Sequence, residues 1–223
     1  MNLALSIAFY FGLAILALGL LLWLILAVLR KKQLGALIVL LIGLLITLTP
    51  VGIKGYLNQK DQHEKQVQLT QKNKRFDQHE KQFLTHIKKT TVATEYVAQK
   101  YSHVWQQLIK NGSVEIKGTT YTDYEDALAA EGQVLLANKR LDTIDNQYLN
   151  AQSDYQAMQH YQTKDKQSEL KKAQTVLTKT NAFNNTATRP NGTYREYADA
   201  IYQANQRHVQ AMQQLKLTAG KTK

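Results

Sequence analysis

Two long apolar runs separated by four polar residues constrain this chain more than any other feature of its sequence. The first run extends from Leu3 to Leu29 and the second from Leu34 to Ile53, and neither contains an acidic or basic residue. A helix rises about 1.5 Å per residue, so about 20 apolar residues cross the ~30 Å hydrocarbon core of a bilayer. We therefore expect a two-helix transmembrane hairpin over residues 1–53, with spans 3–29 and 34–53.

A cleavable signal peptide is the alternative reading of the first run. Signal peptides carry a basic segment before an apolar stretch of about 7–15 residues. This chain begins Met1-Asn2 without Lys or Arg, and its first apolar run is much longer. The sequence therefore favours a retained span and a multi-pass protein of the cell membrane.

The orientation of the hairpin depends on the basic residues beside the spans. Lys and Arg close to a span are retained on the cytoplasmic side. The cluster Arg30, Lys31 and Lys32 predicts a cytoplasmic loop, so that both termini and the C-terminal domain are extracytoplasmic. Lys54, with Lys60 and Lys65 beyond it, argues for the opposite orientation, and the charge count alone leaves both open. We assign topology and anchoring roles to Arg30, Lys31, Lys32 and Lys54.

Residues 54–82 are rich in Gln, Lys, His and Glu and predict a polar helical stalk, which Pro50 and Gly52 separate from the second span. The hexapeptide Asp61–Gln66 recurs as residues 77–82. Apolar residues at seven-residue spacing, Leu69, Phe76 and Phe83, are typical of a coiled-coil seam. The stalk or the spans are therefore expected to support a homo-oligomer.

Residues 83–217 predict an antiparallel helical bundle, because their apolar residues recur every three or four positions. The first helix ends at Asn111-Gly112, and residues 113–121 favour a short hairpin or an ordered loop. The fold class is thus all-α, and residues 218–223 form an expected disordered tail.

Local signals divide the rest of the bundle into helices. Capping-box patterns begin two of them, at Thr122 with Glu125 and at Thr193 with Glu196. Gly132 or residues 138–140 are expected to break the helix that follows Thr122. Turn residues predict a loop from 181 to 193, before the last helix.

Charge alternates along the soluble part of the chain. Basic and acidic residues number 11 and 5 in residues 54–110, 3 and 8 in 111–162, and 11 and 4 in 163–223. An acidic segment between two basic ones favours antiparallel packing, although each exposed ion pair contributes only ~0–1 kcal/mol. This arrangement also weakens the interpretation of the net charge of +11 as a nucleic-acid signal, and we expect no nucleic-acid partner.

No catalytic, cofactor-binding or metal-binding motif is recognisable. Without cysteine the chain has no thiolate nucleophile and no Cys-based zinc site. The histidines His63, His79, His86, His103, His160 and His208 lack the spacing of a zinc site, and solvated stalk residues are the preferred interpretation. His208 is expected near the C-terminal end of a helix, where the helix dipole favours it slightly. The twelve tyrosines fit either a sugar- or base-stacking platform or, as we prefer, the edge of a helical core. The basic pairs Lys88-Lys89 and Lys171-Lys172 are candidates for an interaction surface.

Three segments carry a resemblance: Val104–Ile109, Tyr124–Leu128, and Arg189–Tyr194 followed by Tyr197. Over about residues 100–217 they resemble poorly characterised membrane-tethered helical proteins of Gram-positive bacteria. The resemblance implies an extracytoplasmic helical bundle and no established activity. The chain departs from the pattern near residues 159–163, where it has no proline.

These features predict a membrane-anchored binding or accessory protein of the bacterial cell envelope, with no enzymatic activity and no cofactor. Its expected partners are the lipid bilayer and either an anionic wall polymer or another membrane protein. The alternative is a cytoplasm-facing adaptor, or an immunity or exclusion factor that acts on a membrane partner. A holin-like pore former would not need so large a bundle.

Overall fold

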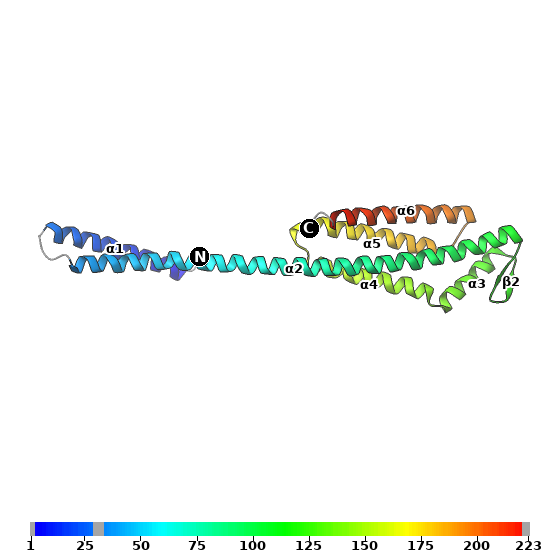
Figure 1. Cartoon of the computed structure of the whole chain (residues 1–223), viewed down its shortest axis with the longest axis horizontal. Helices are drawn as coiled ribbons and strands as arrows, with labels where there is room; N and C mark the ends of the chain where they lie inside the picture. Colours follow the sequence, from blue (N-terminus) through cyan, green and yellow to red (C-terminus); the bar gives the residue numbers. More distant parts are fainter. Residues whose placement is uncertain (1–2, 29–33, 220–223) are drawn as a thin grey trace. The chain divides into compact units, whose positions relative to one another are not determined.

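A computed structural model describes the backbone of residues 3–28 and 34–219, together with the side chains of residues 60–216 and of most residues from 10 to 25. The described part is predominantly helical, with one two-stranded hairpin (Figure 1). In chain order its elements are α1 (Leu3–Val28), α2 (Leu34–Asn111), β1 (Val114–Ile116), β2 (Thr119–Tyr121), α3 (Tyr124–Ala137), α4 (Arg140–His160), the 3₁₀ helix η1 (Lys164–Lys166), α5 (Gln167–Thr188) and α6 (Tyr194–Ala219).

The chain divides into two compact units, Met1–Gln68 and Leu69–Lys223, and the division falls within α2. Our expectation that Pro50 and Gly52 interrupt the helix is wrong, because α2 is helical through both positions. A proline removes only its own N–H from the helical hydrogen bonds, so the helix continues past Pro50 although the neighbouring Thr49, Val51 and Gly52 are weak helix formers.

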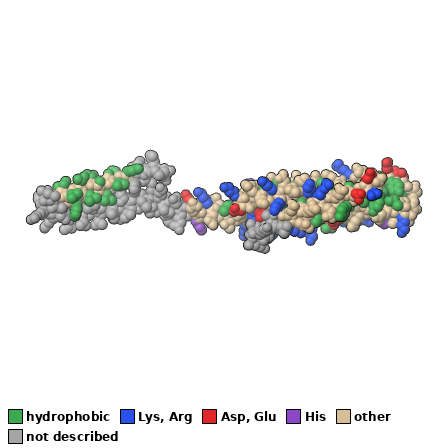
Figure 2. All heavy atoms as spheres, turned by 90° about the horizontal axis from the view of Figure 1, so that it is seen from above, with side chains coloured by type: hydrophobic (Ala, Val, Ile, Leu, Met, Phe, Trp, Pro, Cys, Tyr) green, Lys and Arg blue, Asp and Glu red, His purple; other side chains and the backbone are tan. Residues whose placement is uncertain are grey.

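In the first unit, large apolar side chains of α1 are exposed. Tyr10 is 70% exposed, Phe11 65% and Leu18 59%, and apolar side chains cover much of the described surface of α1 in Figure 2. Among the side chains that the structure describes, no helix contains a stretch long and apolar enough to cross a membrane. Arg30, Lys31 and Lys32 lie outside the described residues, as does the side chain of Lys54.

The second unit is a four-helix bundle of the C-terminal part of α2 with α4, α5 and α6. The chain reverses between α2 and α4, between α4 and α5 and between α5 and α6, so successive helices of the bundle are antiparallel, whereas α3 leads into α4 through a bend (Figure 1). The larger part of the core takes residues from all four: Phe76, Phe83 and Ile87 of α2, Ala151, Tyr155 and Met158 of α4, Leu170, Ala173, Val176 and Leu177 of α5, and Ala211 and Leu215 of α6. The expected helical bundle is confirmed.

The core continues along α2 in two further clusters. Around Val97, Tyr101 and Trp105 pack Leu135 of α3, Ile144 of α4 and Tyr197 of α6. Beyond them, Val104 and Leu108 pack against the hairpin residues Val114 and Ile116 and against α3. The strands pair antiparallel with Val114 opposite Tyr121, which confirms the predicted short hairpin.

Several local predictions are confirmed or corrected. The break between α3 and α4 falls at Lys139, whose backbone is left-handed, and the Thr193–Glu196 capping box is present. The N-cap of α3 is Asp123 rather than Thr122, because its carboxylate accepts bonds from the amides of Glu125 and Asp126. The loop predicted from residue 181 begins only after Thr188, since Phe183, Asn184 and Ala187 are buried and keep α5 helical.

The core also includes residues that the sequence assigned to the stalk. Phe76 is fully buried and Glu80 is 6% exposed, both in α2 before residue 83. The seven-residue spacing of Phe76 and Phe83 is therefore used within the chain, against α4, α5 and α6. Leu69, the first member of the spacing, is 45% exposed.

Candidate binding surface

A groove between α2 and α4, here called the basic groove, is the best candidate for a binding site. It has a volume of about 430 Å³ and is lined by Lys88, Lys89, Val92, Ala93 and Tyr96 of α2 and by Arg140, Thr143 and Gln147 of α4. On α2 these residues follow one face, since positions four apart on a helix are neighbours. Val92 is 60% exposed and Tyr96 37%, so the groove has an accessible apolar floor.

Positive charge borders this floor. Lys88, Lys89 and Arg140 are all exposed, and within the described residues none of them lies within ion-pair distance of a carboxylate. No acidic residue lines the groove. A cation without a local counter-charge attracts anions, and apolar walls strengthen that attraction. The groove is therefore suited to an anionic group attached to an apolar or ring-shaped body.

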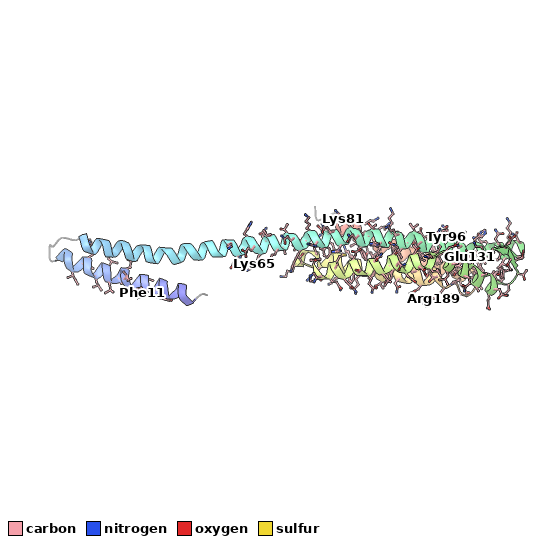
Figure 3. All side chains as sticks on the ribbon, turned by 90° about the horizontal axis from the view of Figure 1, so that it is seen from below. Phe11, Lys65, Lys81, Tyr96, Glu131 and Arg189 are labelled. Carbon is pink, nitrogen blue, oxygen red and sulfur yellow. The ribbon has the colours of Figure 1, made fainter. Side chains whose placement is uncertain are left out.

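Tyr96, which Figure 3 labels on α2, forms one end of the basic groove. The guanidinium of Arg140 lies 4.8 Å from its ring centroid, and the ammonium of Lys100 lies 5.5 Å from it. Cations at such distances are attracted by the ring's quadrupole. The two contacts place two positive charges close to an aromatic ring at the surface.

Tyr96 also lines a second groove, between α2 and α6, here called the polar groove. It has a volume of about 850 Å³, and hydrogen-bonding side chains dominate its lining: Glu95, Gln99, Lys100, Ser102, His103, Gln106 and Asn205. Tyr194 adds a second aromatic ring, fixed by a 2.7 Å bond that its hydroxyl accepts from Gln106 Nε2. The two grooves therefore follow one another along α2.

The structure separates the two basic pairs that the sequence marked. Lys88 and Lys89 both line the basic groove, where Arg140 joins them from a part of the chain with few basic residues. Lys171 is exposed and Lys172 half-buried on α5, and neither lines the basic groove. Sequence reasoning missed Arg140, because only the fold brings α4 beside α2, and it considered Tyr96 only as one of twelve tyrosines that fit a stacking platform or the edge of the core.

A buried ionic cluster lies at the other end of the bundle. The ammonium of Lys166 in η1 forms ion pairs with Asp77 Oδ1 at 2.9 Å and Glu169 Oε2 at 3.0 Å, and it lies 5.4 Å from the Phe76 ring centroid. Glu80 is buried beside them, and burial, followed by the charge of Glu169, raises its pKa. The cluster joins α2, η1 and α5 and is a structural feature rather than a ligand site.

Two histidines that the sequence left as solvated residues join α2 to α4. Asp154 lies 3.1 Å from His79 Nδ1 and 3.7 Å from His86 Nε2, and His86 Nδ1 is 2.9 Å from Gln147 Oε1. The residues the structure describes include no group of three or more His, Asp or Glu arranged to hold a metal ion.

His208 is 2% exposed and lies between three helices. Its Nε2 is 2.9 Å from Thr91 Oγ1 of α2, and its Nδ1 is 3.1 Å from Thr180 Oγ1 of α5. Burial lowers the pKa of this imidazole. Beside it, Thr94 donates to Asn184 at 2.7 Å, so a polar layer interrupts the apolar core.

Comparison with protein-family models, with curated proteins and with solved structures finds no match for this chain. The fold defines it as a predominantly helical protein in which a 78-residue helix, α2, continues into a four-helix bundle.

Proposed function

We propose that this chain is a membrane-anchored, non-catalytic binding protein of the bacterial cell envelope, whose bundle faces the extracytoplasmic side and holds an anionic partner. The observation that carries the proposal is the basic groove, where Lys88, Lys89 and Arg140 meet over an apolar floor without a carboxylate counter-charge. Such a groove attracts anions in a salt-dependent way. Among envelope components, anionic wall polymer has the matching charge.

Two features support the membrane anchor. The uncharged apolar runs 3–29 and 34–53 have the length of spans. The apolar side chains of α1 that are exposed, Phe11 and Leu18 among them, are of the kind that lipid covers. Arg30, Lys31 and Lys32, between the runs, support a cytoplasmic loop. The sequence resemblance to membrane-tethered helical proteins of Gram-positive bacteria agrees with this assignment.

Binding is tested with the full chain in nanodiscs of zwitterionic lipid and a soluble anionic wall polymer as the probe. Substituting Lys88, Lys89 and Arg140 by Gln is expected to weaken binding about tenfold or more at low salt, which corresponds to about 1.4 kcal/mol. The matched control substitutes Lys81, Lys171 and Lys216, which are exposed and line neither groove. Equal losses in both triple variants would show that only net charge matters and would refute the basic groove.

Topology is tested separately, because the chain has no cysteine of its own. Cysteine is introduced at the exposed Gln213 of α6 and, in a second variant, at Gln33 between the apolar runs. A membrane-impermeant thiol reagent should label Gln213→Cys in intact cells and Gln33→Cys only after lysis. The reverse pattern would contradict the extracytoplasmic assignment and favour the cytoplasm-facing adaptor or immunity factor.

A further inference from the structure

The basic groove and the polar groove share Tyr96 and lie at successive positions along α2, and together they are here called the track. The first is lined by α2 residues from Lys88 to Tyr96 and the second by residues from Glu95 to Gln106. At about 1.5 Å per residue, positions 88 to 106 span about 27 Å of helix. A surface of this length is more than a single small anion occupies, so the track suits an extended ligand.

The two halves of the track offer different chemistry. The basic groove offers cations, whereas the polar groove offers the amides of Gln99 and Gln106, the hydroxyl of Ser102 and the imidazole of His103. Glu95 disfavours an anion beside it but accepts hydrogen bonds from hydroxyl groups. Amides and hydroxyls beside a tyrosine ring suit a polyol or sugar, which has many hydroxyls and faces that pack on aromatic rings.

We infer that the track binds a linear polymer in which phosphodiester groups alternate with hydroxyl-bearing carbon units. The phosphodiesters pair with Lys88, Lys89, Arg140 and Lys100, and the hydroxyl-bearing units contact the polar groove. Tyr96, which lines both grooves and has Arg140 and Lys100 close to its ring, provides the packing surface where the grooves meet. This inference rests on the proposed function, because it takes the basic groove as the anion-binding half of the site.

Other ligand classes fit the track less well. A lipid headgroup supplies one phosphate and would occupy the basic groove alone. An acidic protein helix supplies the charge but few of the hydroxyls that the polar groove is equipped to bind. A polymer that repeats both groups satisfies both halves along their whole length.

The test compares two soluble probes on the full chain in nanodiscs of zwitterionic lipid: deacylated polyglycerol phosphate, and inorganic polyphosphate with the same number of phosphates. The diagnostic variant is Gln99→Ala with His103→Ala, whose side chains are exposed in the polar groove. We expect it to weaken polyglycerol phosphate binding about tenfold and to leave polyphosphate binding unchanged. The matched control is Gln206→Ala with Gln210→Ala, exposed at the same spacing on α6 and lining neither groove.

Tyr96→Leu is expected to weaken polyglycerol phosphate binding severalfold, whereas Tyr202→Leu, at a site 66% exposed on α6, should not change it. No effect of the Gln99 and His103 substitutions on either probe would overturn the inference and leave the basic groove intact as an anion site. No effect of the substitutions at Lys88, Lys89 and Arg140 would instead refute the proposed function. Binding to phosphatidylglycerol vesicles, undiminished by excess polyglycerol phosphate, would replace the polymer with a lipid headgroup.

Discussion

Replacing Lys166 by Met should destabilise the bundle far more than a typical lysine substitution. The Lys166 side chain is 9% exposed and neutralises Glu169, whose side chain is 2% exposed. Removing one partner of a buried ion pair costs about 3–5 kcal/mol, because the other charge stays buried without compensation. The contact with Asp77 adds little, since that side chain is 50% exposed and exposed pairs contribute ~0–1 kcal/mol.

The expected loss is therefore about 3–5 kcal/mol, a large share of the ~5–15 kcal/mol that stabilises a typical domain. The assay is thermal unfolding of the full chain in detergent micelles, followed by tryptophan fluorescence. Trp105 is buried in the bundle, so a Trp23→Phe background makes the signal specific for it. At about 2–4 °C per kcal/mol for a domain of this size, the midpoint should fall by about 10 °C or more.

The loss should depend on pH. The pKa of Glu80 is raised by burial and by Glu169, and Lys166 opposes that rise, so Lys166→Met raises it further. A carboxyl whose pKa is raised in the folded state makes the protein more stable as the pH falls through that pKa toward the unfolded value of 4.5, because the folded state then binds the proton more tightly. The stability lost in Lys166→Met should therefore become smaller as the pH falls from 7.5 to 5.

Lys164→Met is the matched control, because Lys164 is exposed on the same short helix. It should change stability by less than about 0.5 kcal/mol. Adding Glu169→Gln to Lys166→Met should recover most of the loss, since the buried charge is then removed. A loss below about 1 kcal/mol for Lys166→Met, or one equal to that of Lys164→Met, would refute the reasoning.

Three further predictions use the same unfolding assay. His208→Leu should cost about 1–3 kcal/mol at neutral pH, because Thr91 and Thr180 lose their imidazole partner. Because the pKa of His208 is lowered in the folded state, the wild type should lose stability as the pH falls below 6.5, whereas His208→Leu should not. If the variant lost stability with falling pH as the wild type does, this prediction would be wrong. Thr193→Ala should cost about 1 kcal/mol through the α6 cap, with the exposed, non-capping Thr119→Ala as the neutral control. Phe83→Ala should cost about 3–5 kcal/mol, against almost nothing for the exposed Leu149→Ala.

The helices and their order could be predicted because their signals are local. Apolar residues every three or four positions predicted the buried face of α2 from Phe83 to Leu108, and Asn111-Gly112 predicted its end. Thr193 and Glu196 predicted the start of α6, because a capping box is formed by residues within a single stretch of four and is therefore also a local signal. The extent of α5 could not be predicted, because the buried contacts of Phe183 and Ala187 outweigh the turn-forming residues around them.

The repeated hexapeptide shows why the polar contacts could not be predicted. In its first copy Asp61, His63 and Glu64 are exposed, and the ion pair of Glu64 with Lys60, 4.0 Å away, is an exposed surface pair. In the second copy Asp77 pairs with Lys166, His79 contacts Asp154 and Glu80 is buried. The sequence of the two copies is the same, so the difference arises entirely from the helices that pack beside them.

The same reasoning applies to the candidate binding surface. Lys88-Lys89 and Lys171-Lys172 are equivalent pairs in the sequence, yet only the first lies beside a helix that contributes another cation and an open apolar floor. Arg140 lies beside Tyr96 because it is the first residue of α4, directly after the left-handed Lys139 at which the chain bends from α3 into α4. An Arg140→Gln substitution should therefore weaken anion binding more than Lys171→Gln at equal charge, and equal effects would mean that the groove has no special role.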